Sequence, residues 1–294
     1  MIPTVSGLIR SHAERTPDAI AIMAPGRQSL TYSGLLQHLD NAVEALNGMG
    51  IGRGDSAALL LPNGPEAATS FLATAACAIS APLNPGYREK ELDYYLSDLR
   101  PKALIVAEDD ESQARTIANK HGIQVGELLV DPGAVAGVFN LVGDKSPQFG
   151  TRGTAEPDDV ALVLHTSGTT STPKIVPLSQ LNICSSARHI SDTLALTNSD
   201  RCLNAMPLFH FHGLVGALLS SMASGASVVC TAGFDSALFP SWLEDHEPTW
   251  YSAVPTIHQA VLDLSRGNSQ EVASSKLRLI RSSSAALASS QRHG

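Results

Sequence analysis

A short segment rich in hydroxyl side chains is the part of the sequence best equipped for chemistry. It follows an apolar run and consists of Thr166, Ser167, Gly168, Thr169, Thr170, Ser171, Thr172, Pro173 and Lys174. Hydroxyl groups and free backbone amides in one turn can surround phosphate oxygens, and a glycine lets the backbone approach closely. A lysine at the end of the turn adds a positive charge. The segment therefore predicts a phosphate-binding loop.

The composition of this segment also permits a second interpretation. Ser, Thr, Gly and Pro are the usual residues of a polar surface turn between a strand and a helix. A loop of the Walker A kind is disfavoured, because that pattern needs Gly-Lys-Ser/Thr at the start of a helix. Here Pro173 precedes Lys174 and Ile175 follows it.

The elements that must position this loop alternate between short apolar runs and longer amphipathic ones, which is typical of βα units. The predicted strands are 56–61, 103–107, 160–165, 202–207, 227–231, 250–254 and 277–282. The predicted helices include 32–49, 65–79, 89–99 and 178–194. We therefore expect an α/β fold with mostly parallel strands covered by helices on both faces. A stretch rich in turn residues over 131–158 predicts a connection between sub-lobes of about 1–150 and 151–294.

Motifs on both sides of the loop point to one family. They are Leu30-Thr31-Tyr32, Leu61-Pro62-Asn63, Pro82-Leu83-Asn84-Pro85, Met206 to Leu214, and Ser252 to Thr256. In this order they resemble the acyl-adenylate-forming (AMP-binding) superfamily, which includes acyl-CoA synthetases, 4-coumarate–CoA ligases and luciferases. The resemblance implies the large N-terminal domain of that fold, with mostly parallel sheets and helices in αβαβα layers.

The resemblance implies an ATP-dependent acid–thiol ligase. In the family, the hydroxyl-rich loop holds the β- and γ-phosphates of ATP while a carboxylate attacks the α-phosphorus, and CoA then takes the acyl group as a thioester. These binding roles carry over to Thr166, Ser167, Gly168, Thr169, Thr170, Ser171 and Lys174. Such chemistry depends mainly on positioning and on neutralising charge. The implied small molecules are ATP, CoA, a small carboxylic acid and Mg²⁺.

Two histidines follow in the downstream motif. His210 matches the family's aromatic or His residue beside the acyl pocket and the path of CoA, which implies a catalytic role and a place in the pocket. A core histidine at the end of a strand is the alternative. His212 lies two residues further on, and in extended backbone the two side chains would share a face. Two ligands are too few for a zinc site, so we expect none there.

A serine-rich turn near the end of the sequence completes the resemblance. The segment Ser282-Ser283-Ser284-Ala285-Ala286-Leu287 resembles the family's Ser-Gly-Ala-Ala-Pro-Leu turn, which lies against adenine and substrate. The resemblance places Ser283, Ser284 and Ala285 at the nucleotide and Ser282 in the substrate pocket with the two histidines. The Phe-His-Phe-His-Gly string and this turn are most similar to the oxalate–CoA ligase branch. A small dianion needs a tight, polar pocket.

The family's later parts do not occur in these 294 residues. They are a Tyr-x-x-Thr-Glu segment for adenine and Mg²⁺, an Asp for the ribose, and a C-terminal domain with a catalytic Lys. We therefore expect an incomplete N-terminal portion that is inactive or nearly so by itself. Exposed sheet edges would favour dimerisation or aggregation. A nucleotide-binding regulatory module or pseudoenzyme without ligase activity is the alternative.

Charge, apolar patterning and cysteine spacing argue against some classes of partner and predict a cellular location. The formal net charge of −8 argues against nucleic acid as a partner. The apolar stretches are interrupted by Pro, Ser and Gly, so we expect no membrane span. The first residues lack a basic region followed by an apolar one, which predicts a cytoplasmic protein without a secretory signal. Four cysteines without disulfide or metal spacing predict reduced thiols.

Overall fold

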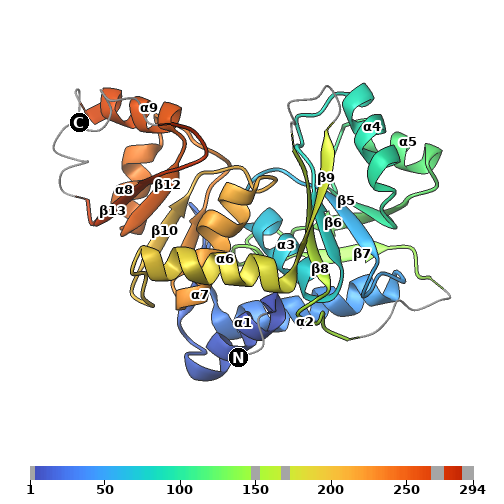
Figure 1. The fold of residues 1–294 in the computed structure, drawn as a ribbon, viewed down its shortest axis with the longest axis horizontal. Helices are drawn as coiled ribbons and strands as arrows, with labels where there is room; N and C mark the ends of the chain where they lie inside the picture. Colours follow the sequence, from blue (N-terminus) through green and yellow to red (C-terminus); the bar gives the residue numbers. More distant parts are fainter. Residues whose placement is uncertain (1–3, 147–152, 167–172, 266–274, 287–294) are drawn as a thin grey trace.

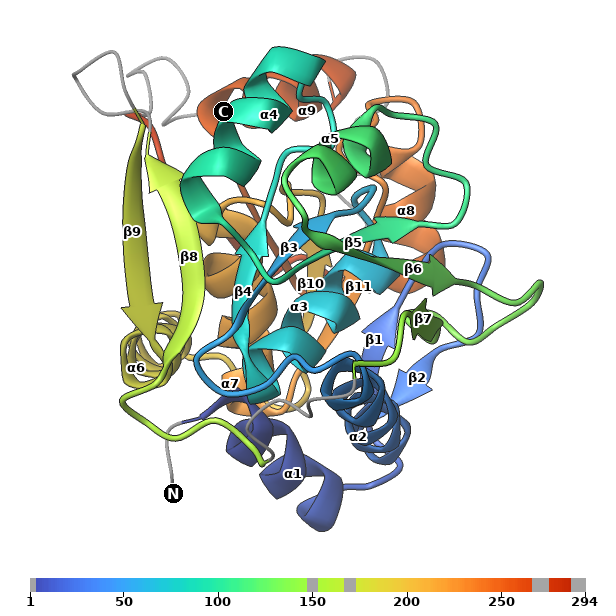
Figure 2. The same ribbon diagram turned by 90° about the vertical axis from the view of Figure 1, so that its right-hand side faces the viewer.

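Two β-sheets lie side by side in the computed structural model, with helices between them and outside each of them (Figure 1). The structure describes residues 4–146, 153–166, 173–265 and 275–286. The view from the side shows α4 and α5 near the top and in front of one sheet, with α1 and α2 along the bottom (Figure 2). None of the helices in these ranges is long and apolar enough to cross a membrane.

The first sheet contains six described strands in the order β13-β12-β10-β11-β1-β2. All neighbours in this sheet are parallel except β1 and β2. The bounds are β1 Ile20–Met23, β2 Leu30–Thr31, β10 Arg201–Asn204, β11 Ser227–Cys230, β12 Trp250–Ala253 and β13 Leu279–Ser282.

The second sheet contains seven described strands in the order β7-β6-β5-β3-β4-β8-β9. Its central pairs are parallel, and an antiparallel pair stands at each edge, β6 with β7 and β8 with β9. The bounds are β3 Ser56–Leu60, β4 Ile79–Pro82, β5 Ala103–Ala107, β6 Gln124–Leu129, β7 Asn140–Gly143, β8 Val160–Thr166 and β9 Lys174–Ser179.

Several helices begin at a residue whose side chain accepts a hydrogen bond from the first turn. Thr4, Thr31 and Ser179 do so from the backbone N–H groups of Gly7, Gly34 and Asn182. The bounds are α1 Val5–Arg15, α2 Tyr32–Gly48, α3 Pro65–Cys77, α4 Glu89–Leu99, α5 Ala114–Lys120, α6 Gln180–Thr193, α7 Ser220–Ser224, α8 Phe239–His246 and α9 Pro255–Ser265. A π-helix, η1, spans His212–Leu219.

The parallel strands are apolar on both faces because helices cover both faces. Successive side chains alternate, so Leu59 of β3 packs in the core between the sheets while Leu60 packs against α4 and α5. In the other sheet, Val228 of β11 joins the inner core and Val229 packs against α8 and α9. Burying one such side chain contributes about 1.5–3 kcal/mol. The arrangement confirms the predicted α/β fold in αβαβα layers.

The bounds of some helices and strands differ from the predicted ones. Helix α3 ends at Cys77, and the residues from Ile79 form β4 rather than the end of a longer helix. Strands from each side of residue 150 join both sheets, since β1 and β2 pair into the sheet of β10–β13 while β8 and β9 extend the sheet of β3–β7. The division into sub-lobes of about 1–150 and 151–294 stays a prediction. All four cysteines are free, and Cys77, Cys202 and Cys230 are buried.

Candidate active site

The hydroxyl-rich segment connects two antiparallel strands. Thr166 ends β8 and Lys174 begins β9, and the two residues face each other across the ladder. Both are exposed, whereas Ser167, Gly168, Thr169, Thr170 and Ser171 lie outside the described residues. The turn was expected to lead from a strand into a helix over 178–194. That expectation was wrong, because β9 intervenes and α6 begins at Gln180.

A histidine that the sequence analysis did not single out anchors the base of this hairpin. The side chain of His165 is 7% exposed, and its Nε2 atom lies 3.1 Å from the Oδ2 atom of Asp98 on α4. Its ring meets the ring of Tyr95 edge to face, with 4.6 Å between centroids. The contacts tie the end of β8 to α4, so they fix where Thr166 and Lys174 stand.

Two asparagines hold the loop that carries the paired histidines. The side-chain amide of Asn63 donates to the Thr231 carbonyl over 2.9 Å, and its oxygen accepts from the Leu208 backbone N–H over 2.8 Å. Asn204 donates to the Gly213 carbonyl over 3.1 Å. The Leu-Pro-Asn motif therefore links the second sheet to the loop after β10, which gives that motif a structural role.

The loop from Pro207 to His212 turns sharply instead of running extended. A Cβ atom at Gly213 would overlap the carbonyl oxygen of Pro207 and lie 3.0 Å from that of Met206, so only glycine fits. The expectation that His210 and His212 share a face of extended backbone was therefore wrong. His210 is exposed with its ring 4.5 Å from that of Phe209, while His212 begins η1 and is buried. Partial burial lowers the pKa of His210.

Both ring nitrogens of His212 face hydroxyl groups. Nε2 lies 2.6 Å from the Oγ atom of Ser252 on β12, and Nδ1 lies 3.0 Å from the Oγ atom of Ser284. Burial, with smaller effects from Arg281 and His258, lowers the pKa of His212 to about 4. The ring is therefore neutral at pH 7, and it joins the end of β12 to the serine-rich turn.

Arg281 on β13 is the site residue that the sequence analysis missed. Its Nη1 atom donates to the Oγ atom of Ser252 over 3.1 Å and to the Gly216 carbonyl over 3.3 Å. Its Nη2 atom donates to the Oγ atom of Ser283 over 3.3 Å. Partial burial lowers the pKa of Arg281. The one signal in the sequence was that the strand predicted over 277–282 contains two arginines, Arg278 and Arg281.

Only part of the serine-rich turn contacts His212 and Arg281. The backbone N–H of Ser283 donates to the Ala253 carbonyl over 3.1 Å, and Ser284 has a left-handed φ of 70°. The Oγ atom of Ser282 is buried and has no hydrogen-bond partner among the described residues. Ala285 is exposed beside it. Ser284 therefore contacts His212 directly, and Ser283 is linked to it through Arg281 and Ser252. Among the described residues, His210 makes no hydrogen bond to these groups.

A buried carboxylate fixes the start of β13. Asp200 is 4% exposed and accepts hydrogen bonds from Arg278 at 2.7 Å and from the hydroxyl of Thr249 at 2.6 Å. Burial alone would raise the pKa of Asp200, but hydrogen bonds from Arg278, Thr249 and the backbone N–H of Thr197 outweigh it and lower the pKa to about 2. Arg281 follows three residues after Arg278, so this anchor sets its position.

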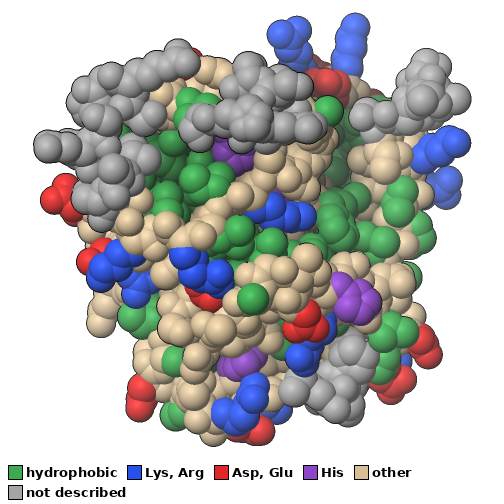
Figure 3. Space-filling view, turned by 60° about the vertical axis from the view of Figure 1, so that its left-hand side comes forward, with side chains coloured by type: hydrophobic (Ala, Val, Ile, Leu, Met, Phe, Trp, Pro, Cys, Tyr) green, Lys and Arg blue, Asp and Glu red, His purple; other side chains and the backbone are tan. Residues whose placement is uncertain are grey.

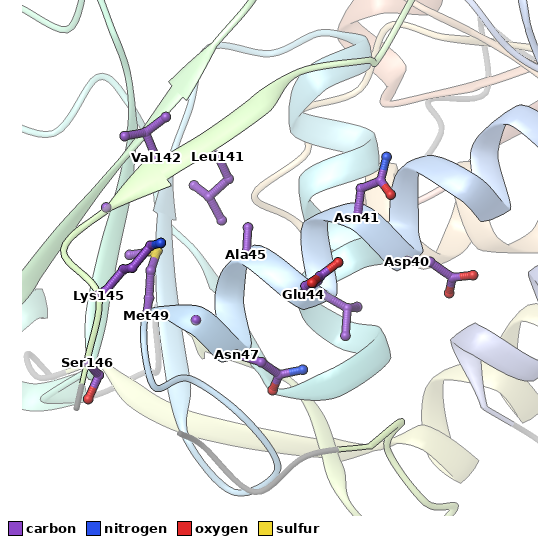
Figure 4. Close-up of a pocket in the computed structure, with 13 residues that line it drawn as sticks. Asp40, Asn41, Glu44, Ala45, Asn47, Met49, Leu141, Val142, Lys145 and Ser146 are labelled. Carbon is purple, nitrogen blue, oxygen red and sulfur yellow. The ribbon is translucent and has the colours of Figure 1, made fainter. Parts of the chain in front are cut away.

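A large groove lies elsewhere on the described part of the chain. A groove of about 820 Å³ runs between the end of α2 and the edge strand β7 (Figure 4), and its lining includes Glu44, Met49, Leu141, Val142 and Lys145. None of the predicted site residues that the structure describes lines it. On the face drawn in Figure 3, acidic and basic side chains of the described residues are interspersed without one dominant charged patch.

Comparison with known proteins decides the family. The model of the AMP-binding enzyme family matches residues 9–292. This chain belongs to the AMP-binding enzyme family. It is 41% identical over 290 residues to an oxalate–CoA ligase of Arabidopsis thaliana, covering 97% of this chain and 56% of the plant protein. An oxalate–CoA ligase of Saccharomyces cerevisiae is 38% identical over 267 residues, covering 82% and 48% of the two chains.

Solved structures share the fold. ATP-bound MatB from Rhodopseudomonas palustris superposes with a TM-score of 0.82 at 26% identity, covering 99% of this chain and 56% of that one. VinN in complex with L-aspartate gives a TM-score of 0.79 at 24% identity, covering 98% and 71%. The chain therefore spans about half the length of the curated relatives it matches.

Proposed function

We propose that this chain provides the nucleotide- and acid-binding part of an AMP-forming acyl-CoA ligase, and that the acid is oxalate or a similarly small dicarboxylate. The observation that carries the proposal is the position of Thr166 opposite Lys174 at the base of the hydroxyl-rich loop, in a chain of the AMP-binding family. The names of relatives at about 40% identity support oxalate as the acid.

The proposed reaction has two steps. An oxygen of the substrate carboxylate bonds to the α-phosphorus of ATP, and the bond from that phosphorus to pyrophosphate breaks. The CoA thiol then loses its proton, its sulfur bonds to the acyl carbon, and AMP leaves. In both steps the protein mainly positions groups and offsets charge.

The hydroxyl-rich loop, the serine-rich turn and His210 each have a role in this proposed reaction. Thr166, Lys174 and the loop between them bind the β- and γ-phosphates, and Ser283, Ser284 and Ala285 border the nucleotide. The lowered pKa of His210 leaves its exposed ring unprotonated at pH 7, so it can accept the thiol proton. Among the described residues, no group of three His, Cys, Asp or Glu side chains could hold a metal ion. Mg²⁺ that binds together with ATP would neutralise charge on the phosphates.

Exchange of radioactive pyrophosphate into ATP, measured in the complete natural protein, tests the first step. We expect exchange that depends on a small dicarboxylate, and we expect Thr169→Ala and Lys174→Ala to reduce it by at least about tenfold, because each removes a donor to transferring phosphates. Lys90→Ala is the control, since it removes an exposed lysine on α4. Unchanged exchange in both loop variants would refute the assignment.

A second measurement separates the proposal from a regulatory nucleotide-binding module. Binding of ATP to the 294-residue chain can be followed by calorimetry. ATP binding without exchange by any acid in the complete protein would support the regulatory module. Loss of both would remove the nucleotide assignment altogether.

A further inference from the structure

Arg281 is a partly buried cation with only neutral hydrogen-bond acceptors. Its three described bonds run to a serine hydroxyl, a second serine hydroxyl and a backbone carbonyl. Two other half-buried arginines face carboxylates, Arg27 with Glu66 and Arg53 with Asp159, whereas Arg201 donates to Ser227 and to the His246 carbonyl. No described carboxylate lies within ion-pair distance of Arg281. Removing an unpaired charge from water is costly, so this guanidinium is poised to gain from a bound anion.

The hydrogen-bonding capacity of Arg281 is also incompletely used. A guanidinium has five N–H groups in a fixed plane, and two of them can bind one carboxylate side by side. The Nε–H group of Arg281 has no acceptor among the described residues, and Nη2 has one such acceptor, Ser283. The edge of the Arg281 guanidinium that carries Nε and Nη2 can therefore bind a carboxylate.

The groups around Arg281 add hydrogen bonds without adding charge. His212 is neutral because its pKa lies at about 4, and its two ring nitrogens are occupied by Ser252 and Ser284. The cluster formed by His212, Ser252, Arg281, Ser283 and Ser284 thus carries a single positive charge. One carboxylate would neutralise this positive charge. A dicarboxylate keeps one such carboxylate after its other end has reacted.

The cluster is closely packed on the side of η1. Arg281 packs against η1, where a Cβ atom added to Gly216 would lie 3.0 Å from Nη1 of Arg281 and 3.4 Å from Cδ2 of His212. A hydrocarbon tail pressed against the guanidinium would remove water from the charge without returning a hydrogen bond. The cluster therefore favours a short, polar acid.

We propose that Arg281 determines specificity by binding the non-reacting carboxylate of a short dicarboxylate. This inference rests on the proposed ligase function, and it adds the residue that selects a dicarboxylate over a monocarboxylate of similar size. Ser252 and Ser283 hold the guanidinium in place, and His212 fixes Ser252 in turn. Ser282, on the opposite face of β13, takes no part in this contact.

The test compares acids and variants in the complete natural protein. Pyrophosphate exchange is measured with oxalate, malonate, acetate and hexanoate for the wild type, Arg281→Gln and Arg281→Lys. We expect Arg281→Gln to lower kcat/KM for oxalate by about 10–100-fold, mainly through KM, because a charged hydrogen bond is lost. Acetate should change by less than about threefold, and Arg281→Lys should fall between. Arg10→Gln, on the surface of α1, controls for the loss of one charge.

The other possible results separate a failure of the specificity proposal from a failure of the ligase function. Equal losses for oxalate and acetate in Arg281→Gln, with a lower Tm, would show a structural role and overturn the proposal. A wild type that prefers acetate or hexanoate would overturn it while leaving the ligase function intact. Absence of exchange with every acid would instead refute the ligase function. Calorimetric titration of the wild type and Arg281→Lys with oxalate provides a check that needs no turnover: weaker binding by the variant is expected, and equal binding would contradict the proposal.

Discussion

The Nε2 atom of His212 lies 2.6 Å from the Oγ atom of Ser252, 40 residues further along the chain. This bond joins the start of the π-helix to the end of β12, and Ser252 also accepts a hydrogen bond from Arg281. One serine hydroxyl thus connects a helix and two neighbouring strands. Short π-helices are frequent at functional sites, where they re-aim side chains.

Protonation of His212 should make stability depend on pH. Its folded pKa of about 4 lies below the ordinary 6.5, so the unfolded chain binds the proton more readily between these values. The free energy of unfolding should therefore fall as pH drops from about 6.5 to about 4, by up to about 3 kcal/mol from this residue. Urea unfolding across this range measures the change.

The variant His212→Asn should flatten that pH dependence, because asparagine does not titrate there. Burial lowers the pKa of His38 to about 4 as well, so His38→Asn should remove a separate share of the same slope. A full pH dependence in the double variant would contradict both assignments.

Replacing the buried carboxylate of Asp200 should strongly weaken the fold around β13. The variant Asp200→Asn loses the ion pair with Arg278 and part of its acceptor capacity, at a cost of about 3 kcal/mol. In the wild type, the stabilisation is present above pH 3.8, the ordinary pKa, and is lost as pH falls towards the folded pKa of about 2. Glu247→Gln, in the exposed pair with Lys276, should cost less than about 1 kcal/mol. Chemical unfolding at pH 7 compares them, and similar losses would show that Asp200 is no special anchor.

A methyl group at Gly213 should not be tolerated. The Cβ atom would overlap the backbone of Pro207, which cannot move aside as a flexible side chain could. We expect Gly213→Ala to lower the free energy of unfolding by about 2 kcal/mol or more through overpacking. Gly48→Ala is the matched control, because nothing lies within 4 Å of a Cβ atom there and α2 gains a better helix former. Its Tm should stay equal or rise.

The contact between Asp98 and His165 should influence nucleotide binding more than folding. If the hairpin base holds the loop in position, Asp98→Asn should raise the Kd for ATP by about 2–5-fold, because it weakens the partly exposed contact with His165. Asp93→Asn on the same helix removes a pairing with His121 that faces α5 and should leave the Kd unchanged. Equal Kd values for the two variants, measured by calorimetry, would argue against a positioning role for His165.

Local patterns in the sequence predicted the elements that have clear ends. The helix predicted over 89–99 and the strand over 103–107 have the observed bounds, because a capped amphipathic run and a short apolar run are each distinctive. Strand β9 was missed because Pro177 breaks the pattern of a strand. It lies at the edge of the sheet, where a residue without an N–H group is tolerated.

The candidate site could be predicted only where one motif carries it. The loop from Thr166 to Lys174 is contiguous, so its composition suggested either phosphate binding or a polar surface turn. The family resemblance favoured phosphate binding, which stays a prediction. Arg281 gains its meaning from Ser252 and Gly216, which reach it through strand pairing and helix packing. Register across β12 and β13 sets those neighbours, and periodicity along one strand does not reveal register.

The pairing of β1 with β11 means that the first strand is synthesised long before its parallel neighbour. Ile22 stands beside Val228 in the finished sheet, and Met23 stands beside Val229. At about 5–20 residues per second, synthesis of the roughly 200 intervening residues takes roughly 10–40 s. During that interval the apolar first strand has no parallel neighbour, so nascent chains should need shielding by a chaperone until β11 has been made.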